Sequence, residues 1–280
     1  MKLGRISVLS RRAPFTAMAG LVIVSLNALA AILGPDLAPY GEAYPAGEVW
    51  GTPSLEFWLG LDNLGRDMLS RLLFGARTTI SIALAITLLS FALGAALGFS
   101  SALIGRWVDT ALSRLVDALM AVPTIISALV VLSVLGTSMP VLIGTIAVLD
   151  STRVFRLCRA VGLNIATMEY VEVAKLRGER LWWIVRREIL PNALPPLVAE
   201  FGLRFSFAIL FVSSLSFLGL GIQPPTADWG GMVRDNAQAI NFGGLAPLLP
   251  AMAITQLTIG INLLVDGFLS AQNPDRARAR

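Results

Sequence analysis

Residues 78–105 read TTISIALAITLLSFALGAALGFSSALIG, without a charged side chain. This run is longer than the roughly 20 apolar residues that an α-helix needs to cross a bilayer. Its apolar residues do not alternate with polar ones, as they would in a strand of a membrane barrel. Because only helices and closed barrels satisfy their backbone groups in hydrocarbon, the run predicts a membrane-spanning helix and an all-α fold.

The composition of the whole chain agrees with a membrane protein. Hydrophobic residues make up 55% of the 280 residues and charged residues 14%, against about 25% charge in soluble domains. Histidine is absent and Cys158 is the only cysteine, which excludes histidine general-base catalysis, an intramolecular disulfide and a cysteine zinc site. We therefore expect no catalytic residue and no metal site in this chain. The pI of about 9.8 would suit nucleic-acid binding, but the basic residues gather in loops on one predicted side of the membrane, which argues against nucleic acid as a partner.

Further charge-free runs repeat this pattern along the chain. They cover residues 13–35, 118–149, 205–227 and 236–265. The run 118–149 is too long for one helix, and the turn signal Gly136-Thr-Ser-Met-Pro140 divides it. We therefore predict six transmembrane helices, the third near residues 110–135 and the fourth near residues 140–158.

The fourth predicted span is the most polar of the six. Asp150, Arg153 and Arg156 lie in its second half. We expect this end to be frayed into the membrane interface, where arginine side chains snorkel towards water.

Basic residues set the predicted orientation, because cytoplasmic loops are enriched in lysine and arginine. Most of them lie on one predicted side: Lys2, Arg5, Arg11, Arg12, Arg106, Arg114, the basic residues between 153 and 187, Arg276, Arg278 and Arg280. The opposite side has Arg66, Arg71, Arg77 and Arg234. Both termini, residues 1–14 and 271–280, are therefore expected in the cytoplasm, and residues 36–74 and 222–244 outside. The second external loop contains Trp229, which we expect at the headgroups.

A cleavable signal peptide is an alternative interpretation of residues 1–34, which combine a basic start with an apolar stretch. The apolar part exceeds the roughly 7–15 residues of a signal peptide's apolar region. We therefore expect an uncleaved anchor with its first span at residues 15–35.

Small residues recur every four positions within the quoted run, at Ser90, Gly94, Gly98 and Ala102. They share one helix face, and small residues at this spacing let two membrane helices approach closely. We interpret this face as a helix-packing surface.

A polar island interrupts the apolar chain at residues 169–191, which read EYVEVAKLRGERLWWIVRREILP. The pattern indicates a short helix, a glycine break and a second amphipathic segment between two hydrophobic spans. We expect another protein to bind this segment on the aqueous side of the membrane. The segment itself is not expected to catalyse a reaction.

Several motifs resemble those of bacterial ABC importer permeases. Glu172-Val-Ala174, followed by Gly178 and Ile189-Leu-Pro191, is similar to the cytoplasmic EAA loop of these proteins, with Val173 in place of an alanine. Other motifs resemble the dipeptide, oligopeptide and nickel permease family in the expected order: residues 59–71 and 75–77, Val108-Asp109, Arg114, Asp117, Pro123, and residues 189–196, 216–221, 223–225, 229–230 and 262–267.

The resemblance implies a type I importer permease, a multi-pass protein of the bacterial inner membrane. It divides the chain into a periplasmic segment at 36–74 and a permease core at 75–270, with an EAA coupling loop at 160–195 and a periplasmic loop at 222–244. The implied partners are a second homologous permease subunit, two ABC ATPase subunits and an extracytoplasmic solute-binding protein. The only lysines are Lys2 and Lys175, and neither lies in a phosphate-binding Gly-x-x-x-x-Gly-Lys-[Ser/Thr] motif. ATP and Mg are therefore expected on the partner subunits, and this chain is not expected to be an enzyme.

In this resemblance, residues 168–178 correspond to a coupling helix that lies in a cleft of the ATPase. The residues expected to take part are Tyr170, Val171, Glu172, Ala174, Lys175, Leu176, Arg177, Gly178 and Glu179. We expect Val171, Ala174 and Leu176 to offer apolar contacts. Glu172, Lys175 and Arg177 are expected to set the register, and Gly178 to end the helix in the left-handed conformation. An amphipathic helix on anionic lipid is the alternative interpretation.

Three ionisable residues lie in the fourth and fifth predicted spans. Glu200 and Arg204 are four residues apart with the acid first, so they can pair on one helix face. Asp150 stands close to a position where related permeases commonly have an aromatic residue. Because ionisable groups at membrane depth generally face protein or a watery cavity, we hypothesise that the three line or gate the path of a charged or zwitterionic solute. An ion network that only holds the two spans together is the alternative.

An ion-coupled secondary transporter acting without an ATPase is the alternative function. It would need coupling-ion groups at the membrane midplane, but the long runs are nearly free of acids and show no inverted repeat. An intramembrane enzyme would need a histidine, an acid pair or an activated nucleophile. The resemblance makes peptides the expected solutes and leaves chelated nickel and other solutes open, because selectivity in this family rests largely with the binding protein.

Overall fold

The computed structural model describes residues 15–272, and it confirms an all-α protein. Within these residues the only β-structure is a pair of isolated bridges in the segment after the first helix. The elements are α1 (Phe15–Leu37), α2 (Met68–Ile104), α3 (Arg106–Ala121), α4 (Thr124–Leu135), α5 (Met139–Ala166), α6 (Glu169–Leu176), α7 (Leu181–Ile184), the π-helical η1 (Val185–Ile189), α8 (Leu190–Phe217), α9 (Trp229–Asp235), the 3-10 helix η2 (Ala237–Phe242) and α10 (Leu248–Gln272). The predicted cytoplasmic ends, residues 1–14 and the basic tail beyond residue 272, lie outside the described residues.

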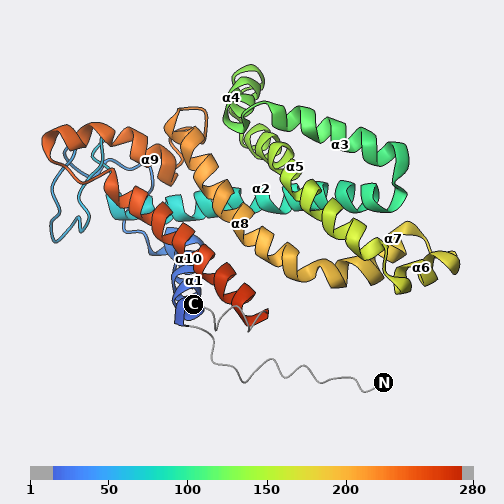
Figure 1. The fold of residues 1–280 in the computed structure, drawn as a ribbon. Helices are drawn as coiled ribbons and strands as arrows, with labels where there is room; N and C mark the ends of the chain where they lie inside the picture. Colours follow the sequence, from blue (N-terminus) through green and yellow to red (C-terminus); the bar gives the residue numbers. More distant parts are fainter. Residues whose placement is uncertain (1–14, 273–280) are drawn as a thin grey trace.

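Helix α2 is the longest element and organises the molecule. Its 37 residues give a length of about 55 Å at roughly 1.5 Å per residue. Asp67 caps its N-terminus, where its carboxylate accepts a hydrogen bond from the Ser70 N–H at 2.8 Å, and Gly105, with a φ of 63°, caps its C-terminus. Figure 1 shows α3, α4 and α5 beside the C-terminal half of α2, with α9 near its N-terminal end. The two ends of α2 therefore carry different parts of the protein.

Four helices are long and apolar enough to cross a membrane. They are α1, α2, the continuous helix Leu181–Phe217 formed by α7, η1 and α8, and residues Leu248–Ser270 of α10. Helices α3 and α4 qualify only as a pair, and they are bent by 86°. By length and composition, the described chain thus has four spans, or five if the bent pair crosses as one unit.

The predicted span near residues 110–135 is broken in the structure into the bent pair α3 and α4. Val122 is extended, with φ −94° and ψ 133°, and α4 begins only after Pro123. Proline disfavours the helical conformation in the residue before it, which is the physical reason for the break. The 12 residues of α4 cover about 18 Å, well short of the roughly 30 Å hydrocarbon core.

The expected fraying of the fourth predicted span is wrong, because α5 continues without a break to Ala166. Two of its arginines are paired with carboxylates of α3. Nη2 of Arg156 lies 2.7 Å from Oδ1 of Asp117, and Arg159 forms a two-pronged ion pair with Asp109. These pairs hold α3 against α5 and neutralise the charge on the second half of α5.

The small-residue face of α2 packs directly against α5, which confirms its interpretation as a packing surface. A Cβ added at Gly94 would lie 2.6 Å from Cβ of Val154, and one added at Gly98 would lie 2.7 Å from Cβ of Cys158. Cβ atoms do not approach other carbon atoms this closely. The distance between the two helices therefore depends on glycine at both positions.

Gly94→Ala is expected to destabilise the protein by about 1–3 kcal/mol, because the new methyl group overpacks the contact between α2 and α5. Gly144→Ala is the matched control, since Gly144 is also helical but no atom lies within 4 Å of its added Cβ. That change is expected to be neutral or to stabilise by about 0.5–1 kcal/mol. Thermal unfolding of both variants in detergent measures the difference, and equal midpoints would contradict the tight packing at Gly94.

Two connecting segments, residues 38–67 and 218–247, fold together near the N-terminal end of α2, and we call them the cap. The N–H of Asn63 donates to Oδ1 of Asn236 at 3.0 Å. The N–H of Ala227 donates to Oε2 of Glu42, also at 3.0 Å. These bonds join segments that are more than 150 residues apart, so the cap is one structural unit.

Trp229 is buried between the rest of the cap and α2. Its indole N–H donates to the carbonyl of Leu72 at 3.1 Å. Gly75 leaves room for the ring, since an added Cβ there would lie 2.9 Å from Cδ1 of Trp229. The tryptophan therefore fastens α9 to α2.

Asp62 is the centre of the first segment of the cap. Its fully buried carboxylate accepts hydrogen bonds from the N–H groups of Leu64 at 2.8 Å and Arg66 at 2.9 Å. It also pairs with the buried guanidinium groups of Arg66, at 2.7 Å, and Arg71. Burial alone would raise the pKa of Asp62, but the hydrogen bonds from Arg66, Arg71 and Leu64 outweigh it and hold the pKa below its ordinary value. The motif at residues 59–71 thus builds a buried carboxylate with two arginine partners.

Candidate functional site

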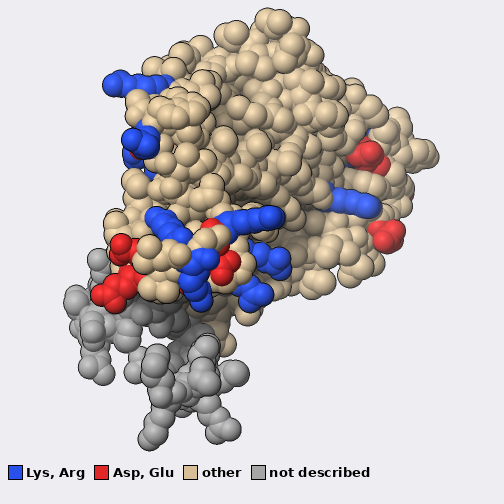
Figure 2. Space-filling view, turned by 90° about the vertical axis from the view of Figure 1, so that its right-hand side faces the viewer, with Lys and Arg blue, Asp and Glu red and all other residues tan. Residues whose placement is uncertain are grey.

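Helix α6 forms from the polar island and lies at the end of the molecule opposite the cap (Figure 1). Glu169 and Glu172 occupy its first turn and Lys175 its last, which is the arrangement that the helix dipole favours. Figure 2 shows the molecule from this end, with the densest group of charged side chains at its lower left and a few others at the upper left and on the right.

The end of α6 confirms the role expected for Gly178. This glycine has a φ of 77°, and its N–H donates to the carbonyl of Lys175 at 3.0 Å. The N–H of Glu179 donates to the carbonyl of Ala174 at 3.2 Å. Together the two bonds form a Schellman motif, in which a left-handed residue satisfies the last carbonyl groups of a helix. The chain is therefore turned sharply between α6 and α7.

The expectation that Val171 and Ala174 offer contacts to a partner is wrong, because both side chains are fully buried within this chain. They belong to an apolar cluster that also contains Ile165 of α5, Ile184 of α7 and Ile189 of η1. Their role is to fasten α6 to the helices on either side of it.

The outward surface of α6 consists of Tyr170, Val173 and Leu176, which we call the α6 face. These side chains are 40%, 52% and 83% exposed. The exposed residues Glu172, Lys175 and Arg177 flank them, and none of the ion pairs in the described part of the chain includes these three. An apolar strip within a polar rim is the usual anatomy of a protein interface. The α6 face can therefore dock another protein.

The structure also brings Asp150, Glu200 and Arg204 together, as the hypothesis of a shared site requires. Nη1 of Arg204 lies 3.2 Å from Oδ1 of Asp150. Its Nε lies 2.8 Å from Oε1 of Glu200, in an ion pair without the angles of a hydrogen bond. Asp150 is buried, and Ser90 of α2 donates to its other oxygen at 3.4 Å. The pairing of Glu200 with Arg204 within α8 is thus confirmed. Asp150 of α5 pairs with the same arginine and so links the two helices.

Sequence reasoning missed Arg153 as a member of this group. Its Nη1 lies 3.4 Å from Oδ1 of Asp150, and its guanidinium lies 4.7 Å from the ring centre of Phe207 in α8. The three-residue spacing from Asp150 was the available signal, because such neighbours share a helix face. We call Asp150, Arg153, Glu200 and Arg204 the α5–α8 cluster. Its two acids and two arginines balance in charge and tie α5 to α8.

Comparisons with known proteins agree with these features. A family model described as binding-protein-dependent transport system inner membrane component matches residues 90–278. The chain is 34% identical to the dipeptide transport system permease protein of Alkalihalophilus pseudofirmus, over 92% of this chain and 85% of that protein. It is 32% identical to the di/tripeptide transport system permease protein of Pseudomonas aeruginosa, over 92% and 88%. It is also 32% identical to the glutathione transport system permease protein of Escherichia coli, over 92% and 86%.

Proposed function

The chain belongs to the family of binding-protein-dependent transport system inner membrane components, and from this premise we propose that it is one permease subunit of an ATP-driven importer. A second homologous permease subunit, two ABC ATPase subunits and an extracytoplasmic solute-binding protein would complete the importer. ATP and Mg belong to the ATPase subunits in this proposal, and this chain contributes no enzymatic step. The observation that carries the proposal is the α6 face, an exposed apolar strip at the end of the molecule opposite the cap.

Force applied to α6 has a continuous route into the membrane helices. Val171 and Ala174 fasten α6 to α5 and α7. The chain then continues through the π-helical η1 into α8 as one unbroken helix. Short π-helical segments are rare and frequently lie at functional sites. We propose that closure of the ATPase subunits moves α6, α5 and α8 as one unit and so exchanges outward for inward access.

The proposed topology places α6 and both termini in the cytoplasm and the cap outside the inner membrane, following the distribution of lysine and arginine. Helix α5 counts as a crossing although it is charged, because Asp150, Arg153 and Arg156 are paired with other groups of the protein. If α3 and α4 make one bent crossing, the count becomes the six of a type I permease.

We propose short peptides as the solutes. The relatives from Alkalihalophilus, Pseudomonas and Escherichia carry the names of dipeptide, di/tripeptide and glutathione permeases. All three solutes are small and carry both an amino group and a carboxylate.

The α5–α8 cluster is proposed to line or gate the solute path. The side chains of Glu200 and Arg204 are 20% and 17% exposed, so neither is sealed inside this chain. Glu200→Gln keeps the shape of the side chain and leaves Arg204 with one carboxylate partner instead of two. We expect it to lower the uptake of charged peptides by roughly tenfold, the usual effect of losing a bond to a charged group. Uptake rates of charged and end-blocked peptides measure this, and equal rates for wild type and variant with assembly intact would reduce the cluster to a structural link.

Reconstitution tests the proposed function as a whole. We expect this chain to copurify with an ATPase and a second permease subunit, and the complex to take up peptide in proteoliposomes only with ATP and the binding protein. Solute entry into vesicles that contain this chain alone would instead indicate a secondary transporter.

A further inference from the structure

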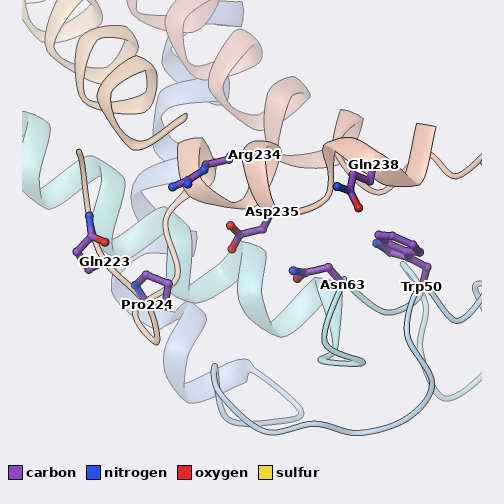
Figure 3. Close-up of a pocket in the computed structure, with 7 residues that line it drawn as sticks. All are labelled: Trp50, Asn63, Gln223, Pro224, Arg234, Asp235 and Gln238. Carbon is purple, nitrogen blue, oxygen red and sulfur yellow. The ribbon is translucent and has the colours of Figure 1, made fainter. Parts of the chain in front are cut away.

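A pocket of about 550 Å³ opens between the two segments of the cap. Figure 3 shows its lining residues, with Gln223 and Pro224 on one side, Arg234, Asp235 and Asn63 in the middle, and Gln238 and Trp50 on the other side. The volume lies within the roughly 300–1,000 Å³ of small-molecule sites. Neither the α6 face nor the α5–α8 cluster contributes to this pocket.

The pocket presents one positive and one negative side chain that are not paired with each other. Arg234 and Asp235 are consecutive residues at the end of α9, and the ion pairs formed within residues 15–272 include neither of them. The guanidinium of Arg234 lies against Gly219, where an added Cβ would be 2.7 Å from its Nη1. Gly219 also has a φ of 86°, a conformation that favours glycine. Glycine at this position therefore leaves the space that the Arg234 guanidinium occupies. Both charges are therefore available to a ligand.

Trp50 adds a wall with an unused hydrogen-bond donor. Its indole Nε1 is buried and has no hydrogen-bond partner among the described residues. The residue has a φ of 53°, which is uncommon for a large side chain and which proteins tolerate chiefly at functional sites. The ring packs against Phe242 at 5.6 Å between centres, which holds it in place. The unsatisfied donor lies within the wall of the pocket and not on its open surface.

The inner side of the pocket leads to a second unused donor. A small cavity of about 20 Å³, with room for about one water molecule, shares Pro224, Arg234 and Asp235 with the pocket. Arg71 lines this cavity, and its buried Nε has no partner in the described part of the chain. The surroundings of the pocket thus contain two buried donors without partners among the described residues, Trp50 Nε1 and Arg71 Nε.

We propose that this pocket binds the two charged ends of a short zwitterionic peptide on the cap side of the permease. Arg234 binds the carboxylate, since a guanidinium matches a carboxylate with two parallel hydrogen bonds. Asp235 binds the ammonium group, and the amides of Asn63, Gln223 and Gln238 bond to the peptide group. Trp50 contacts the peptide's side chains. This inference rests on the proposed function and adds to it a receiving site that recognises the ends of the solute and not its sequence.

Direct binding to the assembled complex tests the site without the binding protein. Dialanine is titrated into the detergent-solubilised complex and followed by saturation-transfer NMR. Arg234→Gln and Asp235→Asn are each expected to raise the Kd by about tenfold. The controls remove the same charges outside the pocket: Arg77→Gln in α2 and Asp36→Asn in α1, both exposed, are expected to leave the Kd unchanged.

Peptides with one blocked end show whether Arg234 binds the carboxylate and Asp235 the ammonium group. C-amidated dialanine is expected to bind wild type and Arg234→Gln equally, and N-acetylated dialanine to bind wild type and Asp235→Asn equally. The proposal is overturned if wild type does not bind dialanine, if both variants bind it as wild type does, or if each variant weakens all peptides alike. It is also overturned if the variants weaken only the docking of the binding protein. ATP-driven uptake by the wild-type importer is a separate measurement, so failure of the proposed function is distinguishable from failure of this site.

Discussion

Leu176→Asp is expected to weaken the binding of the ATPase subunits by roughly 30- to 1,000-fold, the effect of losing a central interface residue worth about 2–4 kcal/mol. Leu176 is the most exposed member of the α6 face, and none of the apolar core depends on it. A carboxylate at this position would enter an interface that we expect to be apolar at its centre. Copurification of the ATPase with the tagged permease measures the loss, together with ATP-driven uptake.

Two variants control this experiment. Leu176→Met keeps an apolar side chain of similar volume and is expected to retain the ATPase. Leu55→Asp makes the same chemical change at a cap residue that is 99% exposed, at the opposite end of the molecule, and it is expected to leave ATPase binding intact. If Leu176→Asp copurifies with the ATPase as well as Leu55→Asp does, the α6 face is not the docking surface.

Asp62→Asn is expected to destabilise the protein by about 3–5 kcal/mol, because it leaves two guanidinium groups buried without a charge partner. Arg66 and Arg71 are 5% and 3% exposed, so neither side chain has much access to water. Glu48→Gln is the control: it neutralises an exposed carboxylate in the same segment and is expected to change stability by less than about 0.5 kcal/mol. Thermal unfolding in detergent compares the two variants, and equal stability would show that Asp62 does not hold the cap together.

The same carboxylate predicts how stability depends on pH. The pKa of Asp62 is lower in the folded protein than its ordinary value. Its contribution is therefore complete above the ordinary carboxyl pKa of about 4 and is lost as the pH falls through the lower, folded-state pKa. Wild type is expected to lose stability more steeply than Asp62→Asn below about pH 4. If both proteins lose stability equally as the pH falls, the ion pairs of Asp62 with Arg66 and Arg71 are contradicted.

The sequence predicted the parts of this fold that depend on local pattern. The charge-free run at 78–105 forms a helix, and Gly94 and Gly98 pack against α5. Gly178 ends α6 in the left-handed conformation. The break before Pro123 was also a local signal, but counting charge-free runs alone overlooked it. Hydrophobicity shows that a segment suits the membrane and does not show whether its backbone stays straight.

Other features depended on contacts that no local pattern specifies. Helix α6 has apolar residues on two faces, Val171 with Ala174 and Val173 with Leu176, so periodicity alone did not say which face is buried. The partner of Arg159 lies 50 residues away on α3. The pocket of the cap combines Trp50 with residues near position 235. These sites required the three-dimensional structure because their members are distant in sequence.

The length of α2 has a mechanical consequence. At about 55 Å, this helix is longer than the roughly 40–45 Å thickness of a bilayer with its headgroups, and it joins the cap at one end to α5 at the other. A rod of this length that tilts by about 5° shifts one end relative to the other by about 5 Å. In the proposed importer, a small tilt of α2 would therefore move one end by a distance comparable to the width of a peptide, and α2 would act as a lever between the two sides of the bilayer.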